Sequence, residues 1–489
     1  MQLSIKKIHR WLGLSLGWLM LIWFLSGAVM MYAAMPRLST DQRLGMAKPL
    51  KADQVRLDFA QAWRKCGQTA PPKSMRLGSL AGWPAYFFLT RDSGFRVVRA
   101  DSGTLLDKVS PELALASAQA GFGSLGPIIP VGVTDKDQWT VGTGSLKEHR
   151  PLYEFQAQDQ AGTRIYVSSR TGEVCQVNTS SQRFWAWLGA VPHWLYFTVL
   201  RQHLEFWRWS IILLSALGCL LCLSGLWLGA RYFRWRGWGQ GKHCRKSVYL
   251  GWRRWHHYLG LIFGLSLLTW TFSGMLSLHP FDWCTPSKPS PAIVKALSGG
   301  TPRPDNMLLH PAQAIAALPG AVKELRVINF QGEPYYHFQD SAKGSRLIPA
   351  KRPEALVLKE ISLEKMSIAA QDLVPGYRVG QVERLDKGDL YTRKANGPLL
   401  RVQYDDPNGT WLYLDQRKGS AALVMDRTGR INRWLYRFLH CFDLPWLMAN
   451  RWLRDPLMLL LLLGGAGVCF SGPWAWVVRL KRRRAGGGG

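Results

Sequence analysis

Residues 9–27 read HRWLGLSLGWLMLIWFLSG, and residues 256–274 read HHYLGLIFGLSLLTWTFSG. The two stretches lie 247 residues apart and share a histidine, a Leu-Gly pair, a tryptophan and a Ser-Gly pair at matching positions. Each leads into a charge-free apolar segment that is long enough to cross the hydrocarbon core of a bilayer, about 30 Å thick. The two stretches therefore predict membrane-spanning helices in a chain with an internal repeat.

The same offset links landmarks along almost the whole chain. Pro151 falls on Pro398, and Ser224-Gly225 falls on Ser471-Gly472, with no net insertion between them. A shift that stays fixed through apolar and polar regions is not an effect of composition. We therefore expect a fused duplication, in which residues from about 9 to 236 are repeated from about 256 to 483.

Each repeat begins and ends with an apolar segment, which gives four predicted spans and the order span, domain, span in each half. The spans are Leu12–Ala34, Trp209–Ala230, Tyr258–His279 and Pro456–Val478. The first is longer than the apolar core of a signal peptide, and its repeat mate lies in mid-chain, so we expect it to be retained.

Basic residues predict the orientation of these spans. The link at 231–254 carries eight basic residues and no acidic one, and the tail at 479–484 adds five more. The positive-inside rule then places both termini and the link in the cytoplasm and the two large domains outside, in a periplasm or its equivalent. The terminal Gly486–Gly489 is excluded as a cloning scar.

The net charge of +30 and the pI of about 10.1 would suggest nucleic acid as the partner of a soluble protein. Here the basic residues before the first span, in the link and in the tail account for sixteen of the positive charges. We therefore expect membrane lipid and no nucleic acid as a partner, while the remaining positive charge outside could attract an anionic substrate.

The large domains are predicted to be α+β. Strands with alternating apolar residues and Gly/Asn/Asp turns, as at 151–157 and 398–404, favour antiparallel hairpins. Asp53–Arg64 and Pro311–Leu318 favour helices. The expected architecture is a four-transmembrane-helix bundle with two α+β outer domains of about 150 residues each, enough for independent cores.

The predicted boundaries follow. They are a first transmembrane helix at 1–35, a first outer domain at 36–185, an interfacial segment with the second helix at 186–231, the basic link at 232–254, the third helix at 255–279, a second outer domain at 280–432, an interfacial segment with the fourth helix at 433–479, and the basic tail at 480–489.

Several motifs together resemble the PepSY-associated transmembrane family. They are the His-Arg-Trp-Leu-Gly opening of the first span, the Thr-Gly-Glu-Val turn at 171–174 and the Leu-Ser-Gly-Leu-Trp end of the second span. The resemblance covers about residues 3–483. It implies PepSY domains in the periplasm and two b-type haems in the bundle, as in di-haem inner-membrane ferric-siderophore reductases.

The histidines support haem independently of that resemblance. A bis-histidine haem needs two imidazoles at one membrane depth that approach the iron from opposite sides. His9 and His256 match across the repeat and precede spans on the cytoplasmic side, whereas His193 and His440 match and precede spans on the outer side. We predict one haem for each pair. Since His193 and His440 each lie 16 residues before a span, the outer haem requires the chain to fold back.

Other residues compete for these roles. His257 is mismatched with Arg10 across the repeat, whereas His279 at the outer end of the third span could replace an outer ligand. His203 lies near cations, and Arg201 and Arg451 are candidates to hold haem propionates. We expect a solvated His243, and core or surface roles for the remaining histidines, which are His149, His310 and His337.

The sequence has no Rossmann or P-loop fingerprint in a strand–turn–helix context, so a quinol or a separate reductase is the expected electron donor. The predicted function is reduction of a periplasmic ferric siderophore, which would loosen the chelator's hold on iron. Two alternatives stay open. The haems could serve another periplasmic acceptor, or the chain could be a non-enzymatic PepSY protein that binds or restrains a protease.

Overall fold

A computed structural model describes residues 2–92, 94–233, 247–284, 288–340, 344–354, 356–392 and 397–485. The chain forms two compact units. The helical unit contains residues 1–35, 181–284 and 431–489, and the sheet unit contains residues 36–180 and 285–430.

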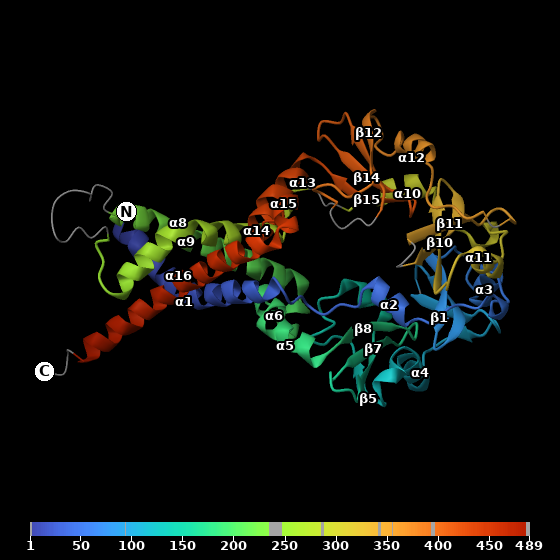
Figure 1. The fold of residues 1–489 in the computed structure, drawn as a ribbon, viewed down its shortest axis with the longest axis horizontal. Helices are drawn as coiled ribbons and strands as arrows, with labels where there is room; N and C mark the ends of the chain where they lie inside the picture. Colours follow the sequence, from blue (N-terminus) through green and yellow to red (C-terminus); the bar gives the residue numbers. More distant parts are fainter. Residues whose placement is uncertain are drawn as a thin grey trace. The chain divides into compact units, whose positions relative to one another are not determined.

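Four long helices of the helical unit lie side by side (Figure 1). They are α1 (Gln2–Met30), α8 (Leu204–Tyr232), α9 (Trp252–Leu276) and α16 (Arg451–Ala485). All four are long and apolar enough to cross a membrane. They begin before the predicted spans, because a charge-free window leaves out polar first turns whose backbone is still helical. His9 and His256 therefore lie inside α1 and α9 and do not precede them.

The core of this bundle is apolar and closely packed. Met20, Phe24, Leu267 and Trp270 are buried at its centre, and the Phe24 and Trp270 ring centroids lie 5.8 Å apart. A Cβ at Gly465 of α16 would lie 2.7 Å from the Phe24 ring, so this glycine lets the ring lie directly against the helix backbone.

The chain folds back before α8 and before α16. It reverses at Leu195 (φ 50°) and at Phe442 (φ 48°), both in the left-handed region that few non-glycine residues adopt. As a result, His193 lies against α1 and His440 lies against α9. The short helices around these reversals are α5 (Ser180–Leu188), α6 (Ala190–Trp194), α7 (Thr198–Arg201), α13 (Arg427–Asn432), the π-helical turn η6 (Arg433–Phe438), α14 (Leu439–Cys441) and α15 (Pro445–Ala449).

The sheet unit is built on one antiparallel sheet that both halves of the chain share. Its strand order is β11-β10-β9-β1-β2-β3-β4, and β1 pairs with β9 at Leu77↔Leu325. One apolar core on this sheet contains Phe59 and Tyr86 from the first half and Tyr336 from the second. The two halves therefore share one core, although each half also has an apolar core of its own, around Ile165 and around Leu412. The strands are β1 (Ser74–Leu80), β2 (Trp83–Leu89), β3 (Phe95–Arg99), β4 (Leu105–Leu106), β9 (Glu324–Phe330), β10 (Glu333–Asp340) and β11 (Gly344–Pro349).

Two further antiparallel sheets contain the predicted hairpins. Their orders are β5-β6-β7-β8 and β12-β13-β14-β15. The strands are β5 (Ile128–Thr134), β6 (Leu152–Ala157), β7 (Arg164–Ser168), β8 (Val174–Asn178), β12 (Val379–Leu385), β13 (Leu399–Tyr404), β14 (Trp411–Asp415) and β15 (Ser420–Met425). The predicted antiparallel hairpins are thereby confirmed.

Helices of the sheet unit differ from the prediction in one place. The expected helix Asp53–Arg64 is broken, because the amides of Arg56 and Leu57 donate to the carbonyl of Ala100 and Asp58 caps a new helix. The helices and 3-10 turns of this part are α2 (Thr40–Met46), η1 (Ala52–Gln54), α3 (Phe59–Lys65), α4 (Pro111–Phe122), η2 (Gly123–Leu125), η3 (Gly144–His149), α10 (Pro291–Ser298), η5 (Pro304–Asn306), α11 (Pro311–Ala317) and α12 (Leu363–Ala370), and η4 (Pro280–Asp282) follows α9.

The repeat register also varies locally. The hairpin turn at Ala81-Gly82 corresponds to Gln331-Gly332, with positive φ at all four residues. That offset is 250 residues, whereas β6 and β13 keep the offset of 247. The second half therefore gains three residues before Gln331, relative to the first half, and loses three again before β13.

Candidate cofactor site between paired histidines

The helical unit brings four predicted histidines together in two pairs. The ring centroids of His9 and His256 lie 6.2 Å apart, and those of His193 and His440 lie 6.1 Å apart. All four come from different helices, namely α1, α9, α6 and α14. Each pair joins two histidines that are 247 residues apart in the sequence.

One ring nitrogen of each histidine is fixed by a neighbouring long helix. The Nδ1 atom of His9 lies 3.2 Å from the Leu221 carbonyl and 3.2 Å from Ser224 Oγ of α8. Its repeat mate His256 makes the same two contacts with α16, to the Val468 carbonyl at 3.2 Å and to Ser471 Oγ at 3.1 Å.

The second pair is held in the same way. The Nδ1 atom of His193 lies 3.1 Å from the Trp23 carbonyl and 3.3 Å from Ser26 Oγ of α1. His440 Nδ1 lies 3.1 Å from Ser273 Oγ of α9. The indole of Trp270 also donates to the His440 carbonyl at 3.0 Å, which fixes the backbone that carries this imidazole.

The serines decide which ring nitrogen carries the proton. Each serine hydroxyl donates to the carbonyl three residues before it, as Ser224 does to Leu221 at 2.9 Å and Ser471 to Val468 at 3.0 Å. Since that hydroxyl proton is already used, the serine oxygen accepts from the imidazole, and Nδ1 is the protonated nitrogen. Nε2 is then left with a free lone pair, the state in which histidine binds a metal.

The glycine after three of the four serines leaves room for the imidazole that a Cβ would reduce, and at Gly274 the contact would be ordinary. A Cβ at Gly225 would lie 2.8 Å from His9 Cε1, and one at Gly472 would lie 3.1 Å from His256 Cε1. The corresponding distances at the second pair are 3.3 Å from Gly27 to His193 and 3.5 Å from Gly274 to His440. Each of the four Ser-Gly pairs therefore forms a binding position for one imidazole, which we call a seat. From the sequence, these pairs are expected to permit close approach of a helix or a macrocycle, but the contact of each serine with an imidazole is not.

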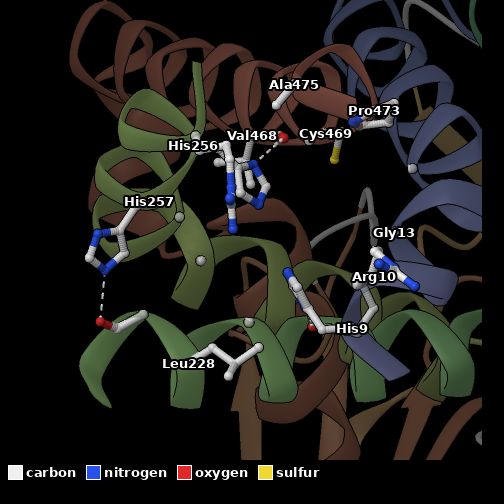
Figure 2. A pocket seen from close by; sticks show the side chains of 18 of the residues that line it. His9, Arg10, Gly13, Leu228, His256, His257, Val468, Cys469, Pro473 and Ala475 are labelled. Atoms are coloured by element: carbon white, nitrogen blue, oxygen red, sulfur yellow. Dashed lines mark hydrogen bonds between the residues drawn. The ribbon is translucent and has the colours of Figure 1, made fainter. Parts of the chain in front are cut away.

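A cavity of about 560 Å³ surrounds the first pair, and Figure 2 shows the side chains of His9 and His256 at it. This volume lies within the range of pockets for small molecules and cofactors, about 300–1,000 Å³. Glycines form much of its wall, so a flat ligand can lie against helix backbone. These glycines are Gly13, Gly17, Gly225, Gly229, Gly260, Gly264 and Gly472.

The spacing of the pairs fits a metal ion held between two imidazoles. Two rings that bind one metal from opposite sides through bonds of about 2.0 Å have centroids about 6 Å apart. Within the described ranges, no three His, Cys, Asp or Glu side chains are grouped so as to hold a metal. Two imidazoles alone leave most coordination positions open, so the donor set suits a metal whose other ligands come from a chelating macrocycle.

Comparison with protein families identifies the chain. The model of the PepSY-associated transmembrane region matches residues 6–479. This chain belongs to the PepSY-associated transmembrane family. The resemblance noted in the sequence is thereby confirmed, and the chain is a membrane protein. A search of curated proteins finds no match to it.

In this member of the PepSY-associated family, His257 is engaged at both ring nitrogens. Nδ1 lies 2.8 Å from Ser247 Oγ, and Nε2 lies 2.8 Å from the Gly229 carbonyl (Figure 2). His257 therefore joins α9 to α8 and leaves no nitrogen for a metal.

The other competing residues contact side chains outside the two histidine pairs. His279 directs Nδ1 to Cys284 Sγ at 2.8 Å, and His203 is exposed beside Gln202. Arg451 lies 3.4 Å from the carboxylate of Asp455. Arg201 packs over the rings of Tyr196 and Trp207, at 5.0 and 4.3 Å, and remains the better candidate for an anionic group near His193.

The histidines of the sheet unit have structural partners. His337 is buried and lies 2.6 Å from Ser345 Oγ, and burial together with the charges of Arg326 and Lys418 lowers its pKa to about 4. His149 lies 3.4 Å from Thr171 Oγ1, and His310 caps α11. His243 lies outside the described residues.

Proposed function

We propose that this protein is a four-span b-type cytochrome of the bacterial inner membrane that passes electrons across the bilayer to a periplasmic ferric siderophore. His9 and His256 would hold one haem b, and His193 and His440 the other. The observation that carries this proposal is the pair of matched imidazole spacings, 6.2 and 6.1 Å, with every Nδ1 turned away to a serine seat.

The membrane orientation follows from charge. Basic residues gather at the N-terminus, in the link and in the tail, so these segments would face the cytoplasm and the sheet unit the periplasm. On α1, His9 and the Ser26 seat of His193 are 17 residues apart, which is about 26 Å along a helix. With a hydrocarbon core of about 30 Å, one pair would lie near each face of the membrane.

The residues of the chain would prepare each site for electron transfer. Haem b, when bound, would supply reversible one-electron transfer between ferric and ferrous iron. The Nδ1–H bond to a carbonyl orients each imidazole and raises its basicity as a ligand. Buried apolar residues between the two levels, among them Met20, Phe24 and Trp270, exclude water from the region between the sites.

The donor and the acceptor follow from what the chain carries. Because the sequence lacks a nicotinamide or flavin fingerprint, a quinol or a separate reductase would supply the electrons. In the ferric siderophore one electron reduces Fe(III) to Fe(II), which the chelator holds less tightly, and iron is released. The PepSY domains would form or cover the docking surface for this substrate.

Internal duplication would explain the matched sites. The four seats use serines at 26, 224, 273 and 471, which are two pairs separated by 247 residues. The two reversals at Leu195 and Phe442 have the same separation. A fused duplication would create two bis-histidine sites at once, since each site takes one imidazole from each repeat.

The deciding experiment is a haem measurement on the detergent-purified protein. A pyridine haemochrome assay should give two haem b per chain, and the reduced protein should release Fe(II) from ferric siderophores to a ferrous chelator. His9→Ala or His256→Ala should lose one haem, and His193→Ala or His440→Ala the other. Two haems without siderophore reduction would favour another periplasmic acceptor. No haem after growth with adequate haem would favour a PepSY binding or protease-restraining protein.

A further inference from the structure

The charged side chains that line the cavity at His9 and His256 are all basic. Its lining contains five cations and no acidic residue, and the cations are Lys6, Lys7, Arg10, Arg253 and Arg479. A cavity wall of this composition favours an anionic group in its ligand.

Two of these cations occupy equivalent sequence positions relative to His9 and His256. Lys6 precedes His9 by three residues in α1, and Arg253 precedes His256 by three residues in α9. Residues three apart lie on the same face of a helix, and the cation is about 4.5 Å nearer the helix N-terminus. Lys6 and Arg253 are also 247 residues apart. Each imidazole therefore has one cation one turn away, on the same side of the site.

The two cations contact two neighbouring tyrosine rings. Lys6 Nζ lies 4.3 Å from the centroid of the Tyr232 ring, and the guanidinium of Arg253 lies 4.9 Å from that of Tyr249. The two tyrosine rings are 6.1 Å apart. Burial raises the pKa of Tyr249, while the charges of Arg253 and Lys6 act against that rise.

No acidic side chain in the described ranges forms an ion pair with either cation. The ion pairs of the helical unit use other arginines, namely Arg208, Arg433, Arg451 and Arg454. The first turn of α9 also contains no acidic residue, although the N-terminus of a helix carries partial positive charge that disfavours Arg253 there. An anion from a ligand would offset both charges.

We propose that Lys6 and Arg253 form a clamp for the two carboxylates of the cofactor bound between His9 and His256, one cation for each carboxylate. This inference rests on the proposed function and adds the residues that orient the inner haem. Both propionates of haem b project from the same edge of the macrocycle. Two cations on one side of the line between the two imidazoles would therefore set the rotation of the macrocycle about that line. A charge-assisted contact to each carboxylate would also retain the cofactor at the cytoplasmic end.

The test compares haem b with its dimethyl ester, which has the same ring and iron but no carboxylate charge. Apoprotein carrying His193→Ala, in which only the inner pair remains, is titrated with each compound and followed by the Soret band. The protein should bind haem b more tightly than the ester by roughly tenfold or more. Lys6→Met with Arg253→Met should remove most of this preference, although Lys7, Arg10 and Arg479 remain in the lining.

Arg254→Met is the matched control, because it removes the same charge from the adjacent position of α9, which does not line the cavity. It should keep the preference. If the double variant does not accumulate, each single variant should lose part of the preference, whereas Lys6→Arg and Arg253→Lys should retain it.

The outcomes separate the two proposals. Equal binding of haem b and its ester by the protein with intact Lys6 and Arg253 would overturn the clamp while leaving the histidine ligands in place. Equal loss of preference in Arg254→Met and in the double variant would assign the effect to general surface charge and overturn it as well. Failure of either compound to bind through the two imidazoles would instead overturn the proposed function.

Discussion

At the scale of single residues, the serine and the glycine of each Ser-Gly pair have separate tasks. The serine accepts from Nδ1 and so leaves Nε2 free, while the glycine leaves space for the ring. Both functions need the same short stretch of helix, and at three of the four seats this explains why the two residues are adjacent.

The glycine function can be tested at the closest seat. Gly225→Ala would place a methyl group 2.8 Å from His9 Cε1, and both lie on packed helices, so the imidazole must leave its seat. We expect this variant to retain one haem of two. Gly467→Ala on α16 is the control, since its Cβ would meet only Leu259 at an ordinary 3.6 Å. Two haems in Gly225→Ala would show that the seat does not position the ligand.

His337 predicts a pH dependence of stability in the sheet unit. Its folded pKa of about 4 lies below the usual value of 6.5, because burial and the charges of Arg326 and Lys418 disfavour the cation. Between these values the unfolded chain binds the proton and the folded chain does not, so stability falls as the pH falls from about 6.5 to about 4, by about 3 kcal/mol in total.

Calorimetric melts of the whole protein between pH 7 and pH 4 would measure this loss. His337→Gln should flatten the fall in Tm over that window, whereas His310→Asn, which keeps an acceptor for the cap of α11, should leave the His337 contribution in place. The same slope in wild type and His337→Gln would rule out His337 as its source.

The sequence could identify candidate ligands where both repeats have the same residue at matching positions. His9, His256, His193 and His440 could be paired from the sequence alone, because each histidine has its mate at the same offset. The serine seats were missed, although the four Ser-Gly pairs occur at that offset too. A sequence pattern shows that a residue recurs, but the hydrogen-bond partner of Nδ1 depends on which helices pack together.

At the scale of elements, an ion cluster holds the strand pair that joins the two halves of the sheet unit. Glu324 of β9 is buried and contacts Arg76 of β1 at 3.2 Å, Arg43 at 2.8 Å and Arg326 at 2.5 Å. Arg76 is also paired with Glu173. Burial opposes ionisation of Glu324, but Arg76 and the other arginines outweigh it and lower its pKa to about 2.

Removing this carboxylate should weaken the junction between β1 and β9. Glu324→Gln leaves three arginines without their shared partner, and breaking a buried ion pair of this kind costs about 3 kcal/mol or more. Glu383→Gln in the more exposed pair with Arg401 should cost less than about 1 kcal/mol. The two variants can be compared by thermal melting at pH 7, and an equal effect would mean that the cluster adds no stability to the junction.

The sequence predicted individual helices and strands better than it predicted how they pair. Period-two patterns gave the hairpins at β6–β7 and β13–β14, and hydropathy gave the four long helices. The pairing of β1 with β9 was not predictable, because it joins residues about 250 positions apart and the sequence of neither strand identifies its partner. The break between η1 and α3 was missed for a similar reason, since Ala100 supplies the competing acceptor.

At the scale of the whole molecule, the proposed arrangement has a direction that can be tested. Electrons would enter at the His9 and His256 site and leave from the His193 and His440 site. The two single-site variants should therefore behave differently toward a donor although each keeps one haem. In proteoliposomes, a short-chain quinol applied to the cytoplasmic face should reduce the remaining haem of His193→Ala as fast as the first haem of the wild type.

His9→Ala should respond in the opposite way. Its remaining haem would lie about 26 Å further along α1, beyond the proposed site of entry, so the quinol should reduce it much more slowly. Dithionite should reduce the remaining haem in both variants, which would show that it is competent, and His203→Ala should keep both haems because the His203 side chain is exposed and contacts Gln202. Equal reduction by quinol in His9→Ala and His193→Ala would contradict the proposed direction. In that case the donor would reach both sites directly, and the protein would not conduct electrons in series across the membrane.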